Sequence, residues 1–164
     1  FSGMEYGKYN DSVLRDVDRS IYDEYKDRLP NNFRKRAEHY YSEMDRVERA
    51  VMAWQKGDIE EFGKISFESG DSSINNYEAG SPELIAIHEI MKETKGVYGG
   101  RFSGAGFKGC CLGIINPDYE DTIKEEITRK YLSIFPEYKD SFNIYYCDTA
   151  DGCDIETKKY VKAR

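Results

Sequence analysis

The spacing of apolar residues changes once along the chain, at Gly96, and this change restricts the possible folds more than any other feature. Up to Gly96, apolar residues recur every three or four positions, which is typical of helices with one buried face. After Gly96, short apolar runs bounded by glycine and proline predict strands, with one further helical pattern among them. Helices followed by a cluster of strands predict an α+β fold, in which an antiparallel sheet packs against several helices.

Proline and glycine residues divide the helical part. A short helix is predicted over residues 13–25, and the Pro-Asn-Asn run at 30–32 separates it from a longer one. The longer helix ends at Gly57, which suits a left-handed cap. Its apolar face is interpreted as core packing, with a groove for a partner helix as the alternative, while Arg, Glu and Asp fill the other face. The apolar face carries Ala37, Tyr40, Met44, Val47, Val51 and Trp54.

Two capping signals begin the next two helices. Asp58, with Glu61 three residues later, matches a capping box. Ser81 before Pro82 is an N-cap with proline at the first helical position. The residues 69–80 between these helices are rich in Ser, Asn and Gly, and they are interpreted as a loop.

Three strands are predicted in the last part of the chain, at residues 97–102, 110–115 and 142–147. A helix that begins at Asp118 and ends at Pro136 separates the second strand from the third. The glycine-rich residues between the first two strands form either a tight structural hairpin or a binding loop.

Charge and composition exclude several classes of partner. The chain of 164 residues has a net charge of −7 and no basic stripe, which argues against nucleic acid and anionic membranes as partners. No apolar run approaches the roughly 20 residues that a membrane-spanning helix needs. The cysteines lack the paired Cys-x-x-Cys spacing of a zinc site, so we expect reduced thiols in a cytoplasmic protein. A disulfide between Cys147 and Cys153 is the alternative; the other two cysteines are Cys110 and Cys111.

The two ends of the chain are expected to lie outside the folded domain, which is expected to span residues 13–154. Residues 1–12 are polar and rich in Gly, Asn and Tyr, and they predict an irregular lead-in. Residues 155–164 are interpreted as a basic tail. Because the chain starts at Phe1, without an initial Met or a signal peptide, we expect it to be a fragment of a longer protein.

Gly104, Gly106 and Gly109 form a Gly-x-Gly-x-x-Gly pattern, which several kinds of phosphate-binding site share. A dinucleotide-binding fold is excluded because its glycines open a helix, whereas here a strand follows and Pro117 leaves no room for a helix. A protein-kinase lid is excluded because the chain has neither His-Arg-Asp nor Asp-Phe-Gly. The remaining alternatives are a structural hairpin and a loop whose backbone N–H groups bind an anion.

In an anion-binding loop, Ser103 would add a hydroxyl donor and Lys108 a positive charge, although Lys108 can equally face water. Other candidate groups point to structural roles. His39 and His88 are the only histidines, and both lie on predicted helices without triad partners, so neither is expected to be catalytic. The acidic residues at 120–126 are interpreted as a solvated helix face and not as a metal site.

The residues around this loop resemble the third motif of the GHMP kinases, in the form found in galactokinases. That form typically reads Gly-Val-x-Gly-(Ser/Ala)-Arg-Met-Thr-Gly-Gly-Gly-Phe-Gly-Gly-Cys, and residues 96–110 read Gly-Val-Tyr-Gly-Gly-Arg-Phe-Ser-Gly-Ala-Gly-Phe-Lys-Gly-Cys. Further stretches resemble galactokinase segments in the same order, so the resemblance covers most of the chain. They are Leu14-Arg-Asp-Val17, Arg36-Ala-Glu-His39 with Glu43 and Arg46-Val47, Gly57-Asp-Ile-Glu-Glu-Phe-Gly63, Glu68-Ser69, Asn76-Tyr-Glu-Ala-Gly-Ser-Pro-Glu-Leu84 and Cys147-Asp-Thr-Ala-Asp-Gly152.

The resemblance implies a GHMP kinase C-terminal domain, a two-layer sandwich whose antiparallel sheet has a ferredoxin-like split βαβ arrangement. The intact enzyme would transfer the γ-phosphoryl group of ATP, bound with Mg²⁺, to the 1-hydroxyl of galactose. The N-terminal domain of the same protein would supply the catalytic carboxylate, the metal ligand and the main ATP site. No catalytic residue or metal ligand is therefore assigned here, and this chain alone is expected to be inactive. Phosphate or substrate contacts are expected from Ser103, Gly104, Ala105, Gly106, Phe107, Lys108 and Gly109.

Four of the departures from the family pattern bear on the site. Ala105 and Lys108 stand where the family has glycine, Gly70 where it often has His, and Ile85 where it often has Asp. Alanine tolerates a positive φ poorly, so the loop geometry must differ if that position requires one. These departures leave N-acetylgalactosamine or another monosaccharide as alternatives to galactose. They also fit a non-catalytic, galactokinase-like sensor that binds sugar and ATP. A freestanding domain that only binds is a third alternative.

Overall fold

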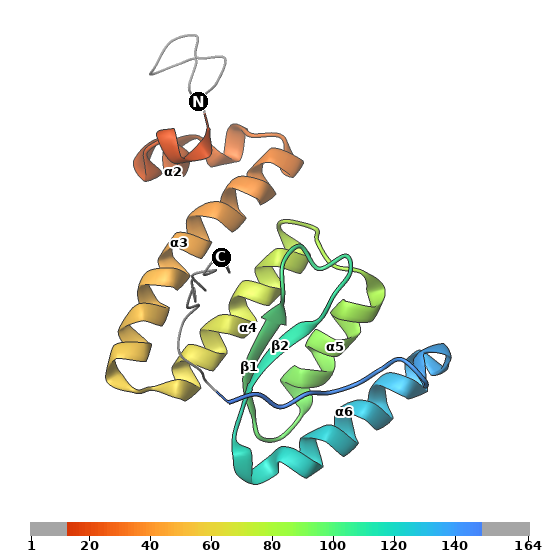
Figure 1. The fold of residues 1–164 in the computed structure, drawn as a ribbon. Coiled ribbons are helices and arrows are strands. Elements are labelled where there is room, and N and C mark those ends of the chain that lie inside the picture. Colours follow the sequence, from red (N-terminus) through yellow and green to blue (C-terminus); the bar gives the residue numbers. More distant parts are fainter. Residues whose placement is uncertain (1–12, 149–164) are drawn as a thin grey trace, which may run out of the picture.

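The computed structural model describes residues 13–148, and Figure 1 shows how their helices and strands are arranged. The predicted lead-in at 1–12, the tail at 155–164 and the last residues of the predicted domain lie outside the described residues. The elements are, in order, a 3-10 turn at Leu14–Asp16, α2 (Arg19–Tyr25), a 3-10 turn at Lys26–Arg28, α3 (Asn31–Lys56), α4 (Ile59–Asn75), α5 (Pro82–Glu93), β1 (Val97–Phe102), β2 (Cys111–Ile115), a 3-10 turn at Pro117–Tyr119, α6 (Glu120–Ile134) and a 3-10 turn at Pro136–Tyr138.

The strands β1 and β2 form an antiparallel pair, in which Gly100 lies opposite Gly113 and Phe102 opposite Cys111. Both α4 and α5 pack against β1, and α5 also contacts β2 and α6. An antiparallel sheet packed against helices confirms the predicted α+β class. The largest buried cluster lies between α5 and α6 and consists of Ile90, Met91, Ile123, Ile127 and Tyr131.

The prediction of a third strand at residues 142–147 is wrong, because this segment forms no ladder with another strand of the described residues. It runs as an extended segment beside α6 (Figure 1). Phe142 and Ile144 pack against the buried cluster, and the Phe142 ring stacks on Tyr131 with centroids 4.4 Å apart. The Tyr146 hydroxyl donates to a backbone carbonyl of α6 at 2.6 Å. Side-chain contacts with α6 hold this segment, in place of the backbone hydrogen bonds of a sheet.

A pair of glycines allows α4 to approach β1 closely. A methyl group added at Gly99 would overlap the backbone of Gly63, and one added at Gly63 would overlap the backbone of Tyr98. These glycines therefore set the separation between the helix and the strand. The two elements then run side by side (Figure 1).

The prediction of a loop at residues 69–80 is wrong for its first part, because α4 continues to Asn75. A side chain at Gly70 would overlap the ring of His88 on α5, so the glycine permits direct contact between the two helices. The hydroxyl of the buried Ser73 bonds to the helix carbonyl one turn earlier, at 2.9 Å. Small side chains weaken this part of the helix locally, but they allow α5 and β1 to pack against it, and tertiary packing outweighs low helix propensity.

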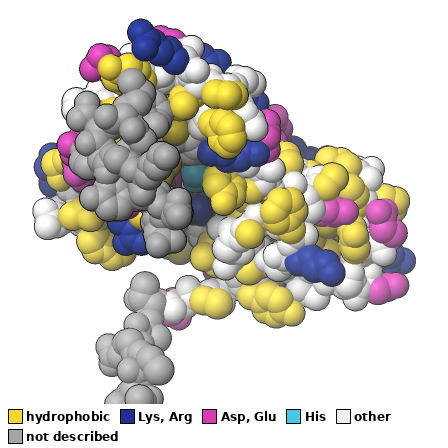
Figure 2. Space-filling model, turned by 90° about the horizontal axis from the view of Figure 1, so that it is seen from above, with side chains coloured by type: hydrophobic (Ala, Val, Ile, Leu, Met, Phe, Trp, Pro, Cys, Tyr) yellow, Lys and Arg dark blue, Asp and Glu magenta, His cyan; other side chains and the backbone are white. Residues whose placement is uncertain are grey.

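The apolar face of α3 is buried only near its start, so its interpretation as core packing is wrong for the second half. Ala37 is buried with Tyr41 and with Tyr22 of α2. Exposed hydrophobic side chains are not confined to α3: on the face of the molecule shown in Figure 2 they are spread among charged ones. Although α3 has 26 residues, no helix of the described residues is both long and apolar enough to cross a membrane. The positions of this predicted face that are at least half exposed are Met44, Val47, Val51 and Trp54.

The predicted caps that end α3 and begin α4 and α5 are confirmed, but Glu61 does not complete the capping box, because the N–H of Asp58 donates to a backbone carbonyl of α3 at 2.9 Å. Gly57 has a left-handed φ of 70° at the end of α3. The Asp58 side chain accepts from the backbone N–H of Glu61 at 3.0 Å, at the start of α4. The Ser81 hydroxyl accepts from the backbone N–H of Leu84 at 3.4 Å and begins α5. These short-range contacts fix where α3 ends and where α4 and α5 begin.

Candidate functional site

Residues 103–109 form the loop between β1 and β2, and two backbone hydrogen bonds fix its ends and its middle. The N–H of Ser103 donates to the carbonyl of Cys110 at 2.9 Å and closes the hairpin. The N–H of Ser81, at the start of α5, donates to the carbonyl of Gly106 at 2.7 Å. The predicted site residues therefore form one continuous segment held beside the N-terminus of α5.

The three glycines of this loop all have a left-handed backbone, with φ of 81° at Gly104, 77° at Gly106 and 110° at Gly109. Gly106 has a second constraint, because a side chain there would overlap the ring of Phe102, which is only 3% exposed. Ala105 does not have a positive φ. The loop therefore accommodates alanine at this position without the backbone strain that a left-handed conformation would cause.

The outer surface of the loop is open. Ser103, Phe107 and Lys108 are exposed, and nothing lies within 4 Å of a side chain built at Gly104. The ammonium group of Lys108 forms no ion pair or hydrogen bond with another described residue. An accessible glycine backbone next to a lysine can bind a phosphate or carboxylate group, because backbone N–H groups and ammonium groups both favour negative charge.

A polar network joins β1 to α3 and α4 just before the loop begins. Arg101 Nη1 donates to Ser69 Oγ at 2.6 Å, and Ser69 Oγ donates to Glu43 Oε1 at 2.6 Å. The other carboxylate oxygen of Glu43 accepts from Arg46 Nε at 2.8 Å. Sequence reasoning did not assign these residues to the site; the signal that pointed to them was the family resemblance of the segments that contain them.

The charges of this network keep Glu43 ionised. Burial alone would raise the pKa of Glu43, but hydrogen bonds from Ser69 and Arg46, together with the positive charges of Arg46 and Arg101, hold that pKa below its usual value. The Glu43 side chain is 26% exposed and that of Arg46 is 10% exposed. One carboxylate therefore lies between two guanidinium groups in a mostly buried position.

His88 belongs to a second polar cluster and is fully buried. Its Nε2 lies 2.9 Å from Asp71 Oδ1, and Lys92 Nζ donates to the same oxygen at 2.8 Å. Burial alone would raise the pKa of Asp71, but the hydrogen bonds from Lys92 and His88 hold it below its usual value. The carboxylate of Glu89 lies close to this pair, so the carboxylates of Asp71 and Glu89 and the imidazole of His88 could together surround a cation. Lys92 already supplies positive charge there, so we assign no metal to this cluster.

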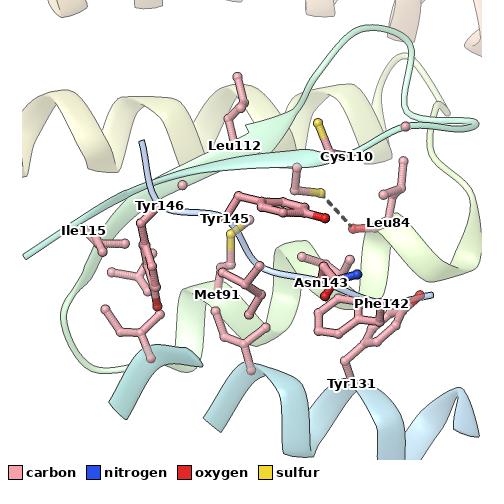
Figure 3. A pocket seen from close by; sticks show the side chains of 18 of the residues that line it. Leu84, Met91, Cys110, Leu112, Ile115, Tyr131, Phe142, Asn143, Tyr145 and Tyr146 are labelled. Atoms are coloured by element: carbon pink, nitrogen blue, oxygen red, sulfur yellow. Dashed lines mark hydrogen bonds between the residues drawn. The ribbon is translucent and has the colours of Figure 1, made fainter. Parts of the chain in front are cut away.

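A cavity of about 1280 Å³ opens between β2, α5, α6 and residues 142–148 (Figure 3). Residues 107–109 of the loop contribute to its lining, but most of its walls are apolar side chains such as Met91 and Tyr131. Cys111 Sγ donates to a backbone carbonyl of α5 at 3.7 Å inside it. Apolar walls suit packing and offer few partners for phosphate, so the open side of the loop is the better candidate for an anion.

Comparisons with known proteins identify relatives of this chain. Residues 48–133 match the family described as GHMP kinases C terminal. The chain is 38% identical over 147 residues to the galacturonokinase of Arabidopsis thaliana, covering 87% of this chain and 35% of that protein. It is 35% identical over 144 residues to the galactokinase of Clostridium acetobutylicum, covering 87% and 36%. The crystal structure of Lactococcus lactis galactokinase complexed with galactose matches with a TM-score of 0.69 and 26% identity, covering 78% of this chain and 33% of that one.

The fold and these matches define a class of protein: the chain belongs to the GHMP kinase family and corresponds to its C-terminal domain. More particularly, it is similar to the sugar kinases of that family, among them galactokinases and a galacturonokinase. The chain spans about a third of the length of these relatives. The resemblance inferred from the sequence motifs is therefore confirmed.

Proposed function

We propose that this chain is the C-terminal domain of a sugar kinase that transfers the γ-phosphoryl group of ATP to the 1-hydroxyl of galactose or a related monosaccharide. The observation that carries the proposal is the open glycine loop at residues 103–109, which lies within the segment that resembles the third motif of the family. Similarity to galactokinases over 87% of the chain supports it. The proposed domain spans residues 13–154, with 1–12 as its lead-in and 155–164 as its tail.

In this proposal the loop acts by position and charge. Phosphoryl transfer needs little covalent chemistry from the protein, so alignment of the reacting groups and neutralisation of charge account for most of the catalysis. The glycines let the backbone come close to the substrates, the Ser103 hydroxyl donates to a phosphate or sugar oxygen, and Lys108 adds positive charge. The N-terminal domain of the same protein would hold most of the ATP and its Mg²⁺, which neutralises phosphate charge when bound.

Galacturonate is a second candidate substrate. The relative that is 38% identical is named a galacturonokinase, and Lys108 stands where the galactokinase motif has glycine. An ammonium group that has no partner among the described residues can pair with the carboxylate of a uronic acid. If Lys108 binds the carboxylate of the sugar, Lys108→Met will lower activity on galacturonate more than activity on galactose.

Phosphorylation assays on the full-length protein that contains this chain test the proposal. ADP release is measured with galactose, galacturonate and N-acetylgalactosamine, and Gly106→Val serves as the loop variant. We expect turnover of one of these sugars, and a sharp fall in kcat or a rise in the KM for ATP in the variant. Unchanged kinetics in Gly106→Val would remove the loop from the active site.

The same assays distinguish the remaining alternatives. Binding of sugar and ATP without turnover would favour the non-catalytic sensor, and turnover of N-acetylgalactosamine alone would change the proposed substrate. The isolated chain is expected to show no turnover, because the proposed catalytic half is not part of it. The cytoplasmic location stays a prediction, which cell fractionation can test.

A further inference from the structure

Three secondary-structure elements meet at the polar network formed by Glu43, Ser69 and Arg101. Ser69 lies at its centre, because its hydroxyl accepts from Arg101 and donates to Glu43, each at 2.6 Å. Arg101 Nη1 also reaches Glu43 Oε1 directly, at 3.3 Å. The network links α3, α4 and β1 through one serine hydroxyl, and each of its hydrogen bonds includes a charged group, which makes such bonds stronger than neutral ones.

We propose that this network positions the glycine loop, with Arg101 as the positioning residue; its role in phosphoryl transfer rests on the proposed function. Arg101 is the penultimate residue of β1, and Phe102 ends the strand directly before the loop. The ring of Phe102 fills the space beside Gly106, whose carbonyl accepts from Ser81 on the other side of the loop. The side-chain contacts of Arg101 therefore fix the end of the strand that supports the loop.

The network and the glycine contact hold β1 at two separate points. Ser69 lies six residues after Gly63, about 9 Å along α4. Arg101 lies two residues after Gly99, about 7 Å along β1. Because these two distances are similar, α4 and β1 can lie side by side from the glycine contact to the polar network. The glycines set the separation at the first point and the network holds the second, so loss of the network frees mainly the end of β1 next to the loop.

Arg49 provides a matched control, because it also links α3 to α4 but forms no hydrogen bond or ion pair with β1. Its guanidinium group lies 2.8 Å from Glu68 and 3.1 Å from Glu61. Its side chain is 43% exposed, compared with 40% for Arg101. A role in general stability predicts similar effects for Arg49→Met and Arg101→Met, whereas positioning predicts an effect on the loop for Arg101→Met alone.

Hydrogen exchange of the two backbone amides that hold the loop, those of Ser103 and Ser81, which donate to Cys110 and Gly106, tests positioning without relying on enzyme activity when it is measured on this chain by mass spectrometry. We expect Arg101→Met to speed this exchange by about tenfold or more, which is the scale of a hydrogen bond to a charged group. Arg49→Met should leave it unchanged. Arg101→Lys should restore part of the protection, because it keeps the charge and a donor.

If Arg101→Met does not fold, the smaller change Ser69→Ala tests whether the network positions the loop. It removes only the central hydroxyl and is expected to speed exchange in the loop as well. The proposal is overturned if loop exchange is unchanged in the folded Arg101 or Ser69 variant, or if Arg49→Met speeds it equally.

Kinetics of the full-length protein separate positioning from direct binding. We expect Arg101→Met to lower kcat by about tenfold or more, since small errors of placement slow the chemical step, while the KM for the sugar stays nearly unchanged. A raised KM with unchanged kcat would mean that Arg101 binds the sugar directly, and it would overturn the positioning role. If the unaltered protein phosphorylates no sugar, the proposed function fails, and hydrogen exchange still decides whether the network positions the loop.

Discussion

Replacing Gly106 with alanine should destabilise the protein more than replacing Gly104, although the two glycines have nearly the same φ, 77° and 81°. A left-handed backbone costs a non-glycine residue about 1–2 kcal/mol. At Gly104 this is the whole cost, because nothing lies within 4 Å of the added methyl group. At Gly106 the methyl group overlaps the buried Phe102 ring, and such overpacking adds about 1–3 kcal/mol. The expected losses are therefore about 1–2 kcal/mol for Gly104→Ala and about 2–5 kcal/mol for Gly106→Ala.

Urea unfolding followed by far-UV circular dichroism measures both free energies. Phe102→Leu supplies a further test, because a smaller side chain leaves room for the methyl group. Gly106→Ala should then cost less in the Phe102→Leu background than in the unaltered protein, as expected for two residues in contact. Equal losses for the two glycine variants, or a loss for Gly106→Ala that is independent of Phe102→Leu, would refute the contact between the ring and the loop.

Four other outcomes are expected. Gly99→Ala should lower the free energy of unfolding by about 1–3 kcal/mol in urea, because its methyl group overlaps the backbone of α4; no loss would contradict the close approach. Val51→Lys should change the same quantity by less than about 0.5 kcal/mol, because Val51 is 50% exposed. The pKa of Glu43 is lowered in the folded protein, so the unfolded chain binds more protons as the pH falls through the usual carboxylate range, and stability decreases there; Glu43→Gln should make that decrease shallower in unfolding measured against pH. Burial raises the pKa of the Cys111 thiol to about 12, so at pH 8 maleimide should label the exposed Cys110 and not Cys111, as read by peptide mass spectrometry.

The features that the sequence predicted correctly depend on contacts between near neighbours in the chain. The Asp58 and Ser81 caps each bond to a backbone N–H three residues later, and Gly57 supplies the left-handed residue that ends α3. The continuous loop at residues 103–109 was predictable for the same reason, because glycine positions and strand boundaries are local signals. Whether this loop binds phosphate remains a prediction.

The features that the sequence predicted wrongly depend on contacts between distant parts of the chain. The apolar run at residues 142–147 correctly indicates an extended segment, but it cannot show that Phe142 and Ile144 pack against the cluster between α5 and α6 in place of pairing with a neighbouring strand. Similarly, the small residues after Ser69 read as a loop, yet they continue α4 because Gly70 makes room for His88. In both cases the local pattern was ambiguous, and the partner element decided the structure.

The two faces of α3 show why hydrophobic spacing alone did not identify the face that packs. The spacing predicted burial of the apolar face, yet Val51 and Trp54 on that face are exposed. Glu43 and Arg46, among the charged residues assigned to the other face, lie in the polar network instead. A charged face can pack when each ionised group finds an opposite charge on a neighbouring element, and here Glu43 finds one in Arg101, 58 residues away in sequence. Charged residues on a helix therefore indicate a solvent face only where no neighbouring element offers the opposite charge, and Glu43 with Arg46 is better interpreted as one half of a polar contact.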